Sequence, residues 1–331
     1  MLVVAALGGN ALLRRGEPLT ADNQRRSVQR AAPALAAILH AGHKLVITHG
    51  NGPQVGLLAL QGAAYKPDEA YPLDILGAET EGMIGYLIEQ ELMNALPPGS
   101  NVATLLTRVE VDPADPAFDQ PIKPIGPVYT AQEGKEVGAE HHWSMVSEAT
   151  GGLRRVVPSP MPMAILGLEP IRLLVEAGVC VVCAGGGGIP VVRNKAGEME
   201  GVEAVIDKDR TAGLLAAALN ADALLLLTDV EAVFAGWGTT DQAAIPVTTP
   251  AALDAMTFAA GSMGPKICAA CAFVRGGGKL AGIGRLADAR AIIEGRTGTR
   301  VVADEEAGFA ARSAKIVAEP TSISAQDAAA V

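Results

Sequence analysis

Aromatic side chains are scarce in this sequence. They make up 3% of its 331 residues, whereas 49% of the residues are hydrophobic. A chain of this length can bury a sizeable core, and that core must be built mainly from alanine, valine, leucine and isoleucine. Positive charge is in deficit too, since the formal net charge is −10. This balance argues against nucleic acid as a partner, and a bound polyanion would need a local cationic site.

Long apolar runs are also missing. No stretch reaches the roughly 20 residues of a membrane-spanning helix. The apolar segment 2–7 is short and has no basic segment before it, so a secretory signal is not indicated. We expect a cytoplasmic protein with no membrane partner.

Cysteine occurs only four times, as the C-x-x-C pairs Cys180/Cys183 and Cys268/Cys271. Such pairs can bind zinc. Here the two pairs are much further apart than in a zinc ribbon, and each lies in an apolar run without turn residues between its cysteines. The pattern favours buried free thiols and no metal-ligating residue.

Strand-like and helix-like segments alternate along the chain. Strands are expected at residues 2–7, 44–48, 101–107, 179–183, 223–228, 280–283 and 299–302. Helices are expected at residues 22–40, 78–96 and 212–219, with another that begins at residue 55. This alternation predicts an α/β fold with a mostly parallel central sheet covered on both faces.

Residues 111–162 break this alternation. The segment is rich in proline, aspartate, glycine and glutamate and contains two proline-punctuated stretches, 121–127 and 157–160. A structureless loop of this length is unusual in a compact domain. We therefore predict a small inserted subdomain that rises from the sheet edge and acts as a lid. The main domain would span residues 1–303, and the polar, alanine-rich segment 304–331 is expected to be a partly disordered tail.

Glycine-bearing loops follow three of the expected strands, at residues 8–10, 50–56 and 185–188. In open α/β sheets, ligands bind at the carboxyl ends of the strands, where these loops would converge. Glycine has no Cβ, so a ligand can approach the backbone N–H groups closely. Three such loops favour a phosphate-bearing ligand over three unrelated tight turns.

The common nucleotide motifs do not fit these loops. Residues 261–267 share with a Walker A sequence only a lysine after glycines, and the last glycine of 50–56 comes one position late for a dinucleotide fingerprint. The expected ribose-binding acid, Asp68 or Glu69, would lie in a loop rather than at a strand end. A nicotinamide enzyme is therefore disfavoured.

Three lysines occupy unusual local contexts. Lys123 precedes a proline in the 111–162 region, Lys208 lies between Asp207 and Asp209, and Lys266 follows two glycines. A lysine ammonium on its flexible stem can follow a phosphoryl group as it moves. Phosphoryl transfer chiefly requires positioning and charge neutralisation. Asp209 would keep neighbouring ammonium groups apart, or it would cap the helix that follows.

Polar residues also end two other strands. Thr228 and Asp229 follow a very apolar strand and would lie at the ligand edge, unless Asp229 only caps the next turn. His49 ends a strand beside glycines, and we interpret it as a hydrogen-bonded structural histidine rather than a catalytic base.

Seven stretches, taken in order, resemble the carbamate kinases of the amino acid kinase family. They are residues 6–12 (ALGGNAL), 48–56 (THGNGPQVG), 123–127 (KPIGP), 156–160 (VVPSP), 185–192, 201–209 and 261–267. The likeness runs from the first strand to about Val302. Each motif alone is modest evidence, whereas the ordered set is specific.

The resemblance implies reversible phosphoryl transfer between ATP and carbamate, which gives ADP and carbamoyl phosphate and usually runs toward ATP in arginine-type catabolism. It also implies Mg²⁺ carried with the nucleotide, an open αβα sandwich, a homodimer and a small protruding subdomain over the active site. Lys208 and Lys266 would hold the phosphate chain and the transferring group. Asp209 would organise these lysines, and Lys123, delivered by the subdomain, would contact carbamoyl phosphate.

By the same resemblance, substrate binding is expected of the glycine-loop residues Gly8, Gly9, Asn10, Gly50, Asn51, Gly52, Gly186 and Gly187. Nucleotide binding is expected of Asp207, Lys208, Thr228, Asp229, Ser262, Met263, Gly264 and Lys266. Two alternatives stay open. A kinase for another small acid, such as an acyl-glutamate-type substrate, would need an arginine near the 50–56 loop, where the sequence has none. The three intact lysines argue against a non-catalytic nucleotide sensor, and metal analysis would test a zinc-binding regulatory protein.

Overall fold

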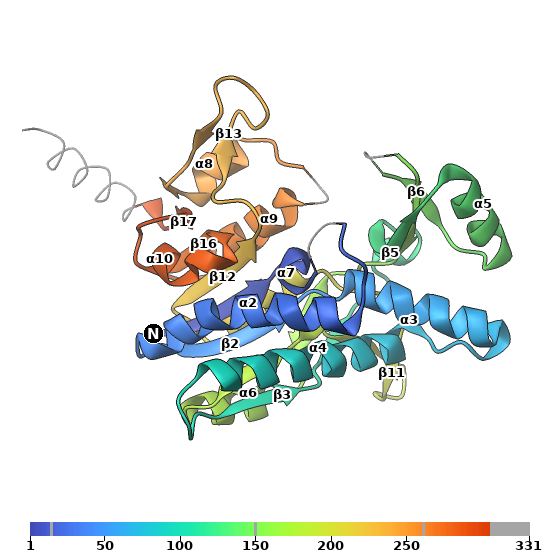
Figure 1. The fold of residues 1–331 in the computed structure, drawn as a ribbon, viewed down its shortest axis with the longest axis horizontal. Coiled ribbons are helices and arrows are strands. Elements are labelled where there is room, and N and C mark those ends of the chain that lie inside the picture. The colour runs from blue at the N-terminus through green and yellow to red at the C-terminus, as the bar shows by residue number, and fades with distance from the viewer. Residues whose placement is uncertain (14–15, 149–150, 260–261, 305–331) are drawn as a thin grey trace, which may run out of the picture.

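The structure is a computed structural model that describes residues 1–13, 16–148, 151–259 and 262–304. The expected tail, apart from Asp304, therefore lies outside the described residues. Figure 1 shows a sheet flanked by helices, with a small group of elements, β5, β6 and α5, that projects from one end.

Eight strands form the central sheet, in the order β15-β17-β16-β12-β1-β2-β9-β3. In that order they span Val247–Thr248, Thr299–Val301, Leu280–Arg285, Ala223–Thr228, Leu2–Leu7, Lys44–His49, Cys180–Cys183 and Val102–Leu105. Neighbouring strands pair in parallel except for β16 and β17. The prediction of an α/β fold with a mostly parallel sheet is confirmed.

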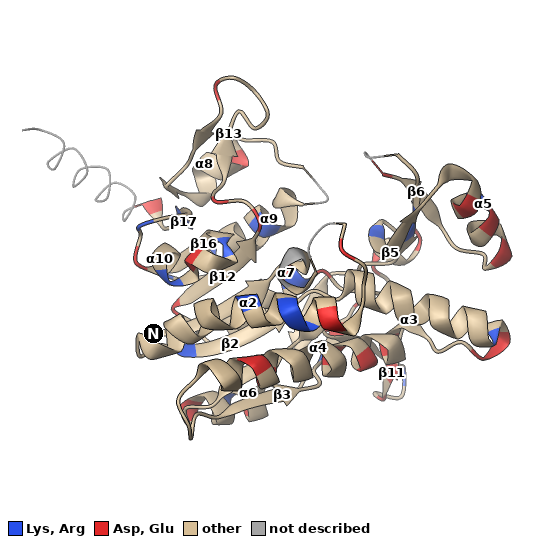
Figure 2. Ribbon diagram, viewed as in Figure 1, with Lys and Arg blue, Asp and Glu red and all other residues tan. Residues whose placement is uncertain are grey.

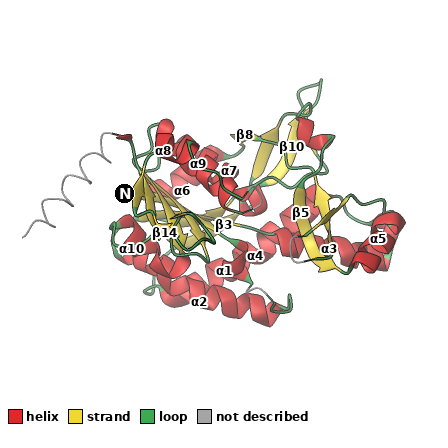
Figure 3. Ribbon diagram, turned by 90° about the horizontal axis from the view of Figure 1, so that it is seen from above, coloured by secondary structure: helices red, strands yellow, loops and turns green. Residues whose placement is uncertain are grey.

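Helices cover both faces of this sheet, as Figure 3 shows. On one face lie α2 (Ala21–His40), α4 (Leu73–Ala95) and α10 (Ala289–Ile293). On the other lie α6 (Leu168–Glu176), α7 (Lys208–Ala218), α8 (Pro250–Asp254) and α9 (Met263–Arg275). The fold is thus an open αβα sandwich.

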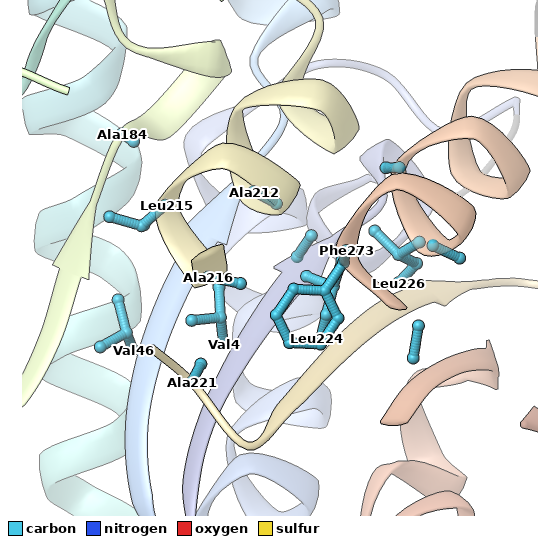
Figure 4. Close-up of a cluster of buried hydrophobic side chains, with 14 of the residues drawn as sticks. Val4, Val46, Ala184, Ala212, Leu215, Ala216, Ala221, Leu224, Leu226 and Phe273 are labelled. Atoms are coloured by element: carbon cyan, nitrogen blue, oxygen red, sulfur yellow. The ribbon is translucent and has the colours of Figure 1, made fainter. Parts of the chain in front are cut away.

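Two apolar cores fill the spaces between these layers. Because successive side chains of a strand point to opposite faces, Val4 belongs to the core under α7 and α9, whereas Val3 belongs to the core under α2 and α4. Figure 4 shows Val4 near Leu224 and the ring of Phe273, which comes from α9. This phenylalanine is a rare aromatic contribution to cores made mainly of aliphatic side chains, as the composition predicts.

The described residues form three smaller sheets besides the central one, the smallest being the pair β13 (Phe234–Ala235) and β14 (Ala243–Ala244). A four-stranded sheet has the order β11-β10-β4-β8, with strands Met199–Gly201, Ile189–Arg193, Arg108–Val111 and Pro162–Ile165. A three-stranded sheet has the order β5-β7-β6, with strands Lys123–Tyr129, Leu153–Val157 and Met145–Ser147. Helix α5 (Ala131–Glu140), whose acidic residues are red in Figure 2, packs against β7. This three-stranded sheet and α5 lie inside the predicted insertion 111–162, and the lid role of that insertion stays a prediction.

The remaining elements are short or lie near the functional edge. They are α1 (Gly9–Leu12), α3 (Gly52–Tyr65), β13 (Phe234–Ala235), β14 (Ala243–Ala244) and the 3-10 turns η1 (Pro67–Glu69), η2 (Pro116–Phe118), η3 (Gly185–Gly187) and η4 (Leu286–Asp288). None of the helices in the described ranges is long and apolar enough to cross a membrane.

The cysteines are free thiols, but their burial differs from the prediction at one position. Cys180, Cys183 and Cys271 are buried, and burial raises the pKa of Cys180 to about 12. Cys268 is exposed, so the prediction of a buried thiol is wrong there. The buried stripe of α9 contains Ile267, Ala270, Cys271 and Val274, which follow the helical period, and Cys268 lies outside that stripe.

Candidate active site

The first turn of α7 places the charged residues Asp207, Lys208 and Asp209 at the edge of the central sheet. Asp207 is the N-cap of this helix: its Oδ1 accepts hydrogen bonds from the backbone N–H groups of Asp209 (3.0 Å) and Arg210 (3.3 Å). The helix therefore begins at Lys208, four residues before the predicted start. The alternative in which Asp209 is the cap is wrong, because the residue two positions earlier fills that role.

Asp209 bridges two of the three singled-out lysines. Its Oδ1 lies 2.8 Å from Nζ of Lys208, and its Oδ2 lies 3.0 Å from Nζ of Lys266 at the start of α9. The side chain of Asp209 is only 4% exposed, against 13% for Lys208 and 10% for Lys266. One buried carboxylate thus holds two ammonium groups near each other, as the prediction that Asp209 organises the lysines requires.

The charges in this cluster depend on one another. Burial, followed by the neighbouring positive charge of Lys208, lowers the pKa of Lys266. Burial also opposes the charge of Lys208, but the carboxylates of Asp209 and Asp207 outweigh burial and raise its pKa. Burial likewise opposes the charge of Asp209, but the two lysines outweigh it and lower the pKa of this carboxyl. Removal of any one member would change the protonation of the others.

Lys123 joins the cluster through the other aspartate. Its Nζ lies 2.5 Å from Oδ2 of Asp207. Lys123 is the first residue of β5, so it lies where the small three-stranded sheet meets the main body. Two aspartates that flank Lys208 in sequence therefore connect three lysines from three separate parts of the chain.

A cavity of about 970 Å³ opens beside Lys208 and Lys266. Of the predicted nucleotide and substrate residues, Gly8, Gly9, Lys208, Thr228, Asp229, Ser262, Met263 and Lys266 line it. Thr228 and Asp229 contact each other through a hydrogen bond of 3.1 Å from the Thr228 hydroxyl. Gly264 lies directly behind the lining, where its N–H donates to the carbonyl of Ala259 at 2.9 Å.

Three aromatic residues in this cavity escaped the sequence reasoning. Phe234, Trp237 and Phe258 line the cavity, and the ring centroids of Phe234 and Trp237 lie 5.3 Å apart. Trp237 is 65% exposed. The sequence contained a sign of this aromatic cluster, because the chain has only 5 Phe and 2 Trp, and three of these seven residues fall within residues 234–258.

Residues 50–56, of which Gly52 begins α3, lie between Lys208 and the start of β5, where Lys123 is found. A Cβ on Gly50 would lie 3.3 Å from Cδ of Lys208, and one on Gly52 would lie 3.7 Å from the carbonyl oxygen of Pro124, the residue after Lys123. Asn51 is buried, and its Nδ2 donates to the hydroxyl of Thr80 at 2.9 Å. Asn10 belongs to α1, directly after the lining residue Gly9.

The glycines at 185–188 allow close packing inside the protein, whereas the sequence suggested that they expose backbone N–H groups to a ligand. The N–H groups of Gly185, Gly187 and Gly188 all donate inside the protein, to Glu81, Ala184 and Gly185 respectively. Side chains are excluded because a Cβ would lie 2.3 Å from Nε2 of His49 at Gly185, 2.2 Å from Nδ2 of Asn51 at Gly186 and 2.5 Å from the carbonyl of Ile206 at Gly187. Close packing explains the glycines, and substrate binding by Gly186 and Gly187 stays a prediction.

Two buried titratable residues lie under this run. Glu81, which the sequence reasoning missed, accepts the N–H of Gly185 (2.7 Å) and of Thr107 (3.1 Å), and burial raises its pKa to about 8. Burial lowers the pKa of His49 to about 4, and its Nδ1 lies 3.1 Å from the carbonyl of Gly50. The structural reading of His49 fits this position. Glu81 belongs to the buried stripe of α4, so the helical period carried the signal for its burial.

Within the described ranges, no group of three or more His, Cys, Asp or Glu side chains is arranged to hold a metal ion. The three lysines therefore place positive charge beside a cavity of about 970 Å³, an arrangement suited to a phosphate-bearing ligand.

Residues 1–283 match the amino acid kinase family. A carbamate kinase of Rhizobium meliloti is 56% identical over 301 residues, which cover 90% of this chain and 92% of the relative. Two solved structures of the carbamate kinase of Giardia lamblia, one bound to citric acid and one to AMP-PNP, superpose with TM-scores of 0.86 and 0.82. Each is 40% identical and covers 92% of this chain and 98% of its own.

Proposed function

This chain belongs to the amino acid kinase family and functions as a carbamate kinase, and we propose how its residues perform the reaction. The reaction is the reversible transfer of a phosphoryl group between ATP and carbamate, with ADP and carbamoyl phosphate as the products. One observation carries the proposal: Asp209 holds Lys208 and Lys266 together at the mouth of a cavity large enough for a nucleotide.

The nucleotide is proposed to occupy the cavity of about 970 Å³. Its base packs against the aromatic wall formed by Phe234, Trp237 and Phe258, and its phosphates extend toward Lys208 and Lys266. The carbamate kinase of Giardia lamblia has been solved with AMP-PNP, which supports this assignment. Mg²⁺ enters with the nucleotide as part of the substrate and neutralises part of the phosphate charge.

The transfer itself is proposed to be a direct in-line displacement. A carbamate oxygen forms a bond to the γ-phosphorus of ATP while the bond to the oxygen that leaves with ADP breaks, so no phosphorylated enzyme is formed. Lys208 and Lys266 stabilise the charge of the group in transit, and Asp209 keeps both ammonium groups aimed at it. Lys123 contacts the carbamoyl phosphate end.

Enclosure supplies selectivity, because carbamate is small and has no side chain to recognise. We propose that the small sheet and α5 act as a lid that excludes water from the labile acyl phosphate.

The decisive assay couples ATP formation from ADP and carbamoyl phosphate with Mg²⁺ to a spectroscopic readout. Acetyl phosphate in place of carbamoyl phosphate is the control substrate. Rapid ATP formation with carbamoyl phosphate and little with acetyl phosphate is expected. Absence of activity with both would contradict the assignment.

Three finer points belong to the same proposal. We propose that the enzyme runs toward ATP in arginine-type catabolism, that it works in the cytoplasm where both nucleotides are abundant, and that it forms a homodimer. Support for the dimer comes from large side chains exposed on α4 and directly after the edge strand β3: Tyr86 (54% exposed), Met93 (47%) and Leu106 (60%). Such a patch is typical of an interface. Sedimentation velocity of the protein tests the dimer.

A further inference from the structure

Lys123 does not sit at the tip of the projecting sheet but at its base. It is the first residue of β5 and pairs in register with Val157, the last residue of β7. Its ammonium contacts the carboxylate of Asp207, and the side chains are 26% and 13% exposed. The resemblance described above implied that the subdomain delivers this lysine, whereas here it already lies against the first turn of α7.

Several contacts fix this base to the main body. The N–H of Val205 donates to the carbonyl of Pro158 at 2.9 Å, directly beyond β7. Ile125, Val157 and Val205 are buried in one apolar cluster with residues of α3 and α4. These contacts lie on both sides of Lys123, so its backbone belongs to the rigid part of the molecule.

The approach of β5 to α3 is unusually close. A Cβ on Gly56 of α3 would lie 2.0 Å from Cα of Gly126 in β5. Gly126 has a positive φ of 71°, a conformation that favours glycine. Any motion of the small sheet therefore has to start beyond this contact, which lies only a few residues after Lys123.

We propose that Asp207 is a positioning residue for Lys123, which it holds in place for carbamoyl phosphate before any closure of the small sheet. The proposal rests on the substrate contact assigned to Lys123 above. Asp207 suits this role because its Oδ1 is fixed by the N–H groups of Asp209 and Arg210, so that Oδ2 is aimed at the lysine. The same carboxylate thereby caps the catalytic helix and orients a lysine from another sheet.

The charge of Asp207 persists in this arrangement. Burial disfavours the ionised form, but Lys123 and Lys208 outweigh burial and keep the pKa of Asp207 well below its usual range. The carboxylate is therefore ionised throughout the pH range of an enzyme assay, and Lys123 always has its partner before substrate arrives.

Asp207→Asn is the informative variant, because asparagine is as good an N-cap as aspartate but carries no charge. We expect the KM for carbamoyl phosphate to rise about tenfold or more, on the scale of a misplaced substrate contact, while the KM for ADP stays unchanged. Glu148→Gln is the matched control. It removes the carboxylate of another ion pair on the small sheet, with Arg154 at 3.4 Å, and should leave both constants unchanged.

A double variant tests whether Asp207 acts through Lys123. Lys123→Ala combined with Asp207→Asn should raise the KM for carbamoyl phosphate no further than Lys123→Ala alone, because Asp207 then has no lysine of β5 left to position. The readout is this KM rather than kcat, since the charge of Asp207 also raises the pKa of Lys208. Independent, additive losses would overturn the positioning role. Asp207→Ala, which also loses the cap, should lower the Tm more than Asp207→Asn and so separates helix stability from positioning.

Chemical labelling reports on the pair without reference to catalysis. In the intact protein, acetic anhydride should modify Lys123 several times faster in Asp207→Asn than in the parent protein, as measured by mass spectrometry, with Lys135 as the internal reference. Equal labelling rates would overturn the pairing itself. Faster labelling together with normal kinetics for both Lys123→Ala and Asp207→Asn would instead refute the substrate contact assigned to Lys123.

Discussion

Asp209 and Glu81 are two almost fully buried carboxylates with opposite surroundings. They are 3% and 1% exposed. Asp209 contacts the ammonium groups of Lys208 and Lys266, which lower its pKa against the effect of burial. Glu81 accepts hydrogen bonds from backbone N–H groups, and burial raises its pKa to about 8.

A buried acidic residue can therefore serve either to organise charges for ligand binding or to hold the backbone of a loop in place. Around Asp209, charged side chains are concentrated, and a charged ligand that enters and leaves the site can be bound there. In the Glu81 region, the carboxylate ties the N–H groups of Thr107 and Gly185 together and thereby holds the glycine run. The first region is expected to govern turnover, and the second the stability and shape of the loop.

Asp209→Asn should have the largest effect, because it removes the carboxylate that contacts two buried ammonium groups. We expect the free energy of unfolding at neutral pH to fall by about 3 kcal/mol or more, as measured by urea denaturation. Asp254→Asn is the matched control: Asp254 pairs with Arg275 on the surface, and its loss should change stability by less than about 1 kcal/mol. Equal effects of the two substitutions would abolish the comparison.

Lys208→Met and Lys266→Met should each lower turnover by roughly a hundredfold or more, the scale of losing one preorganised donor in a transition state. Steady-state kinetics of ATP formation measure this. Lys279→Met, which removes an exposed lysine paired with Asp222, should leave turnover unchanged. Near-normal turnover in either active-site variant would contradict the role proposed for that lysine.

Gly186→Ala tests the other region. A Cβ there would lie 2.2 Å from Nδ2 of Asn51, and the residue has a φ of 68°. Strain of this kind should lower the free energy of unfolding by about 2 kcal/mol. Gly197→Ala serves as the comparison, because Gly197 has a φ of 86° but no atom within 4 Å of its Cβ position. That substitution therefore costs only the backbone strain of a positive φ, without a steric clash. A difference of zero between the two would show that packing does not explain the glycine.

Glu81→Gln should change stability by an amount that depends on pH. The pKa of Glu81 is about 8 in the folded protein, above the ordinary value of 4.5, so the folded state binds the proton more tightly. Its contribution to stability is therefore complete below pH 4.5 and is lost as the pH rises through 8. The stability of the parent protein should fall relative to Glu81→Gln between pH 5 and 8, measured by denaturation at each pH. A constant difference across that range would mean that Glu81 does not titrate there.

Much of the fold and the lysine cluster could be predicted from the sequence. Apolar runs and glycine loops specify strands and their ends locally, and lysines beside aspartates or glycines are recognisable without a structure. The start of α7 was predicted too late because residues 208–211 are polar and show no apolar period, although Asp207 was a readable cap. The pairing of Lys123 with Asp207 depends on how two sheets meet, which no local pattern encodes.

Other parts of the site could not be found for a related reason. The aromatic wall depends on where the chain from Phe234 to Phe258 folds back over the strand ends, and Glu81 matters only because α4 passes under η3. From the sequence, the glycine run was expected to expose backbone N–H groups to a ligand. The structure gives a different reason for glycine there, because His49 and Asn51 occupy the space that side chains would need.

The first turn of α7 carries a consequence for how this sequence can vary. Successive residues of an α-helix point about 100° apart, so Asp207, Lys208 and Asp209 reach different partners only while the helix starts where it does. Substitutions elsewhere change one contact at a time, but one residue inserted or deleted between Asp209 and the mostly buried residues 211–216 of α7 would rotate these three charged residues away from their partners. The first turn should therefore tolerate no change of length, and insertion scanning through residues 202–212 would reveal a sharp boundary in the allowed lengths there.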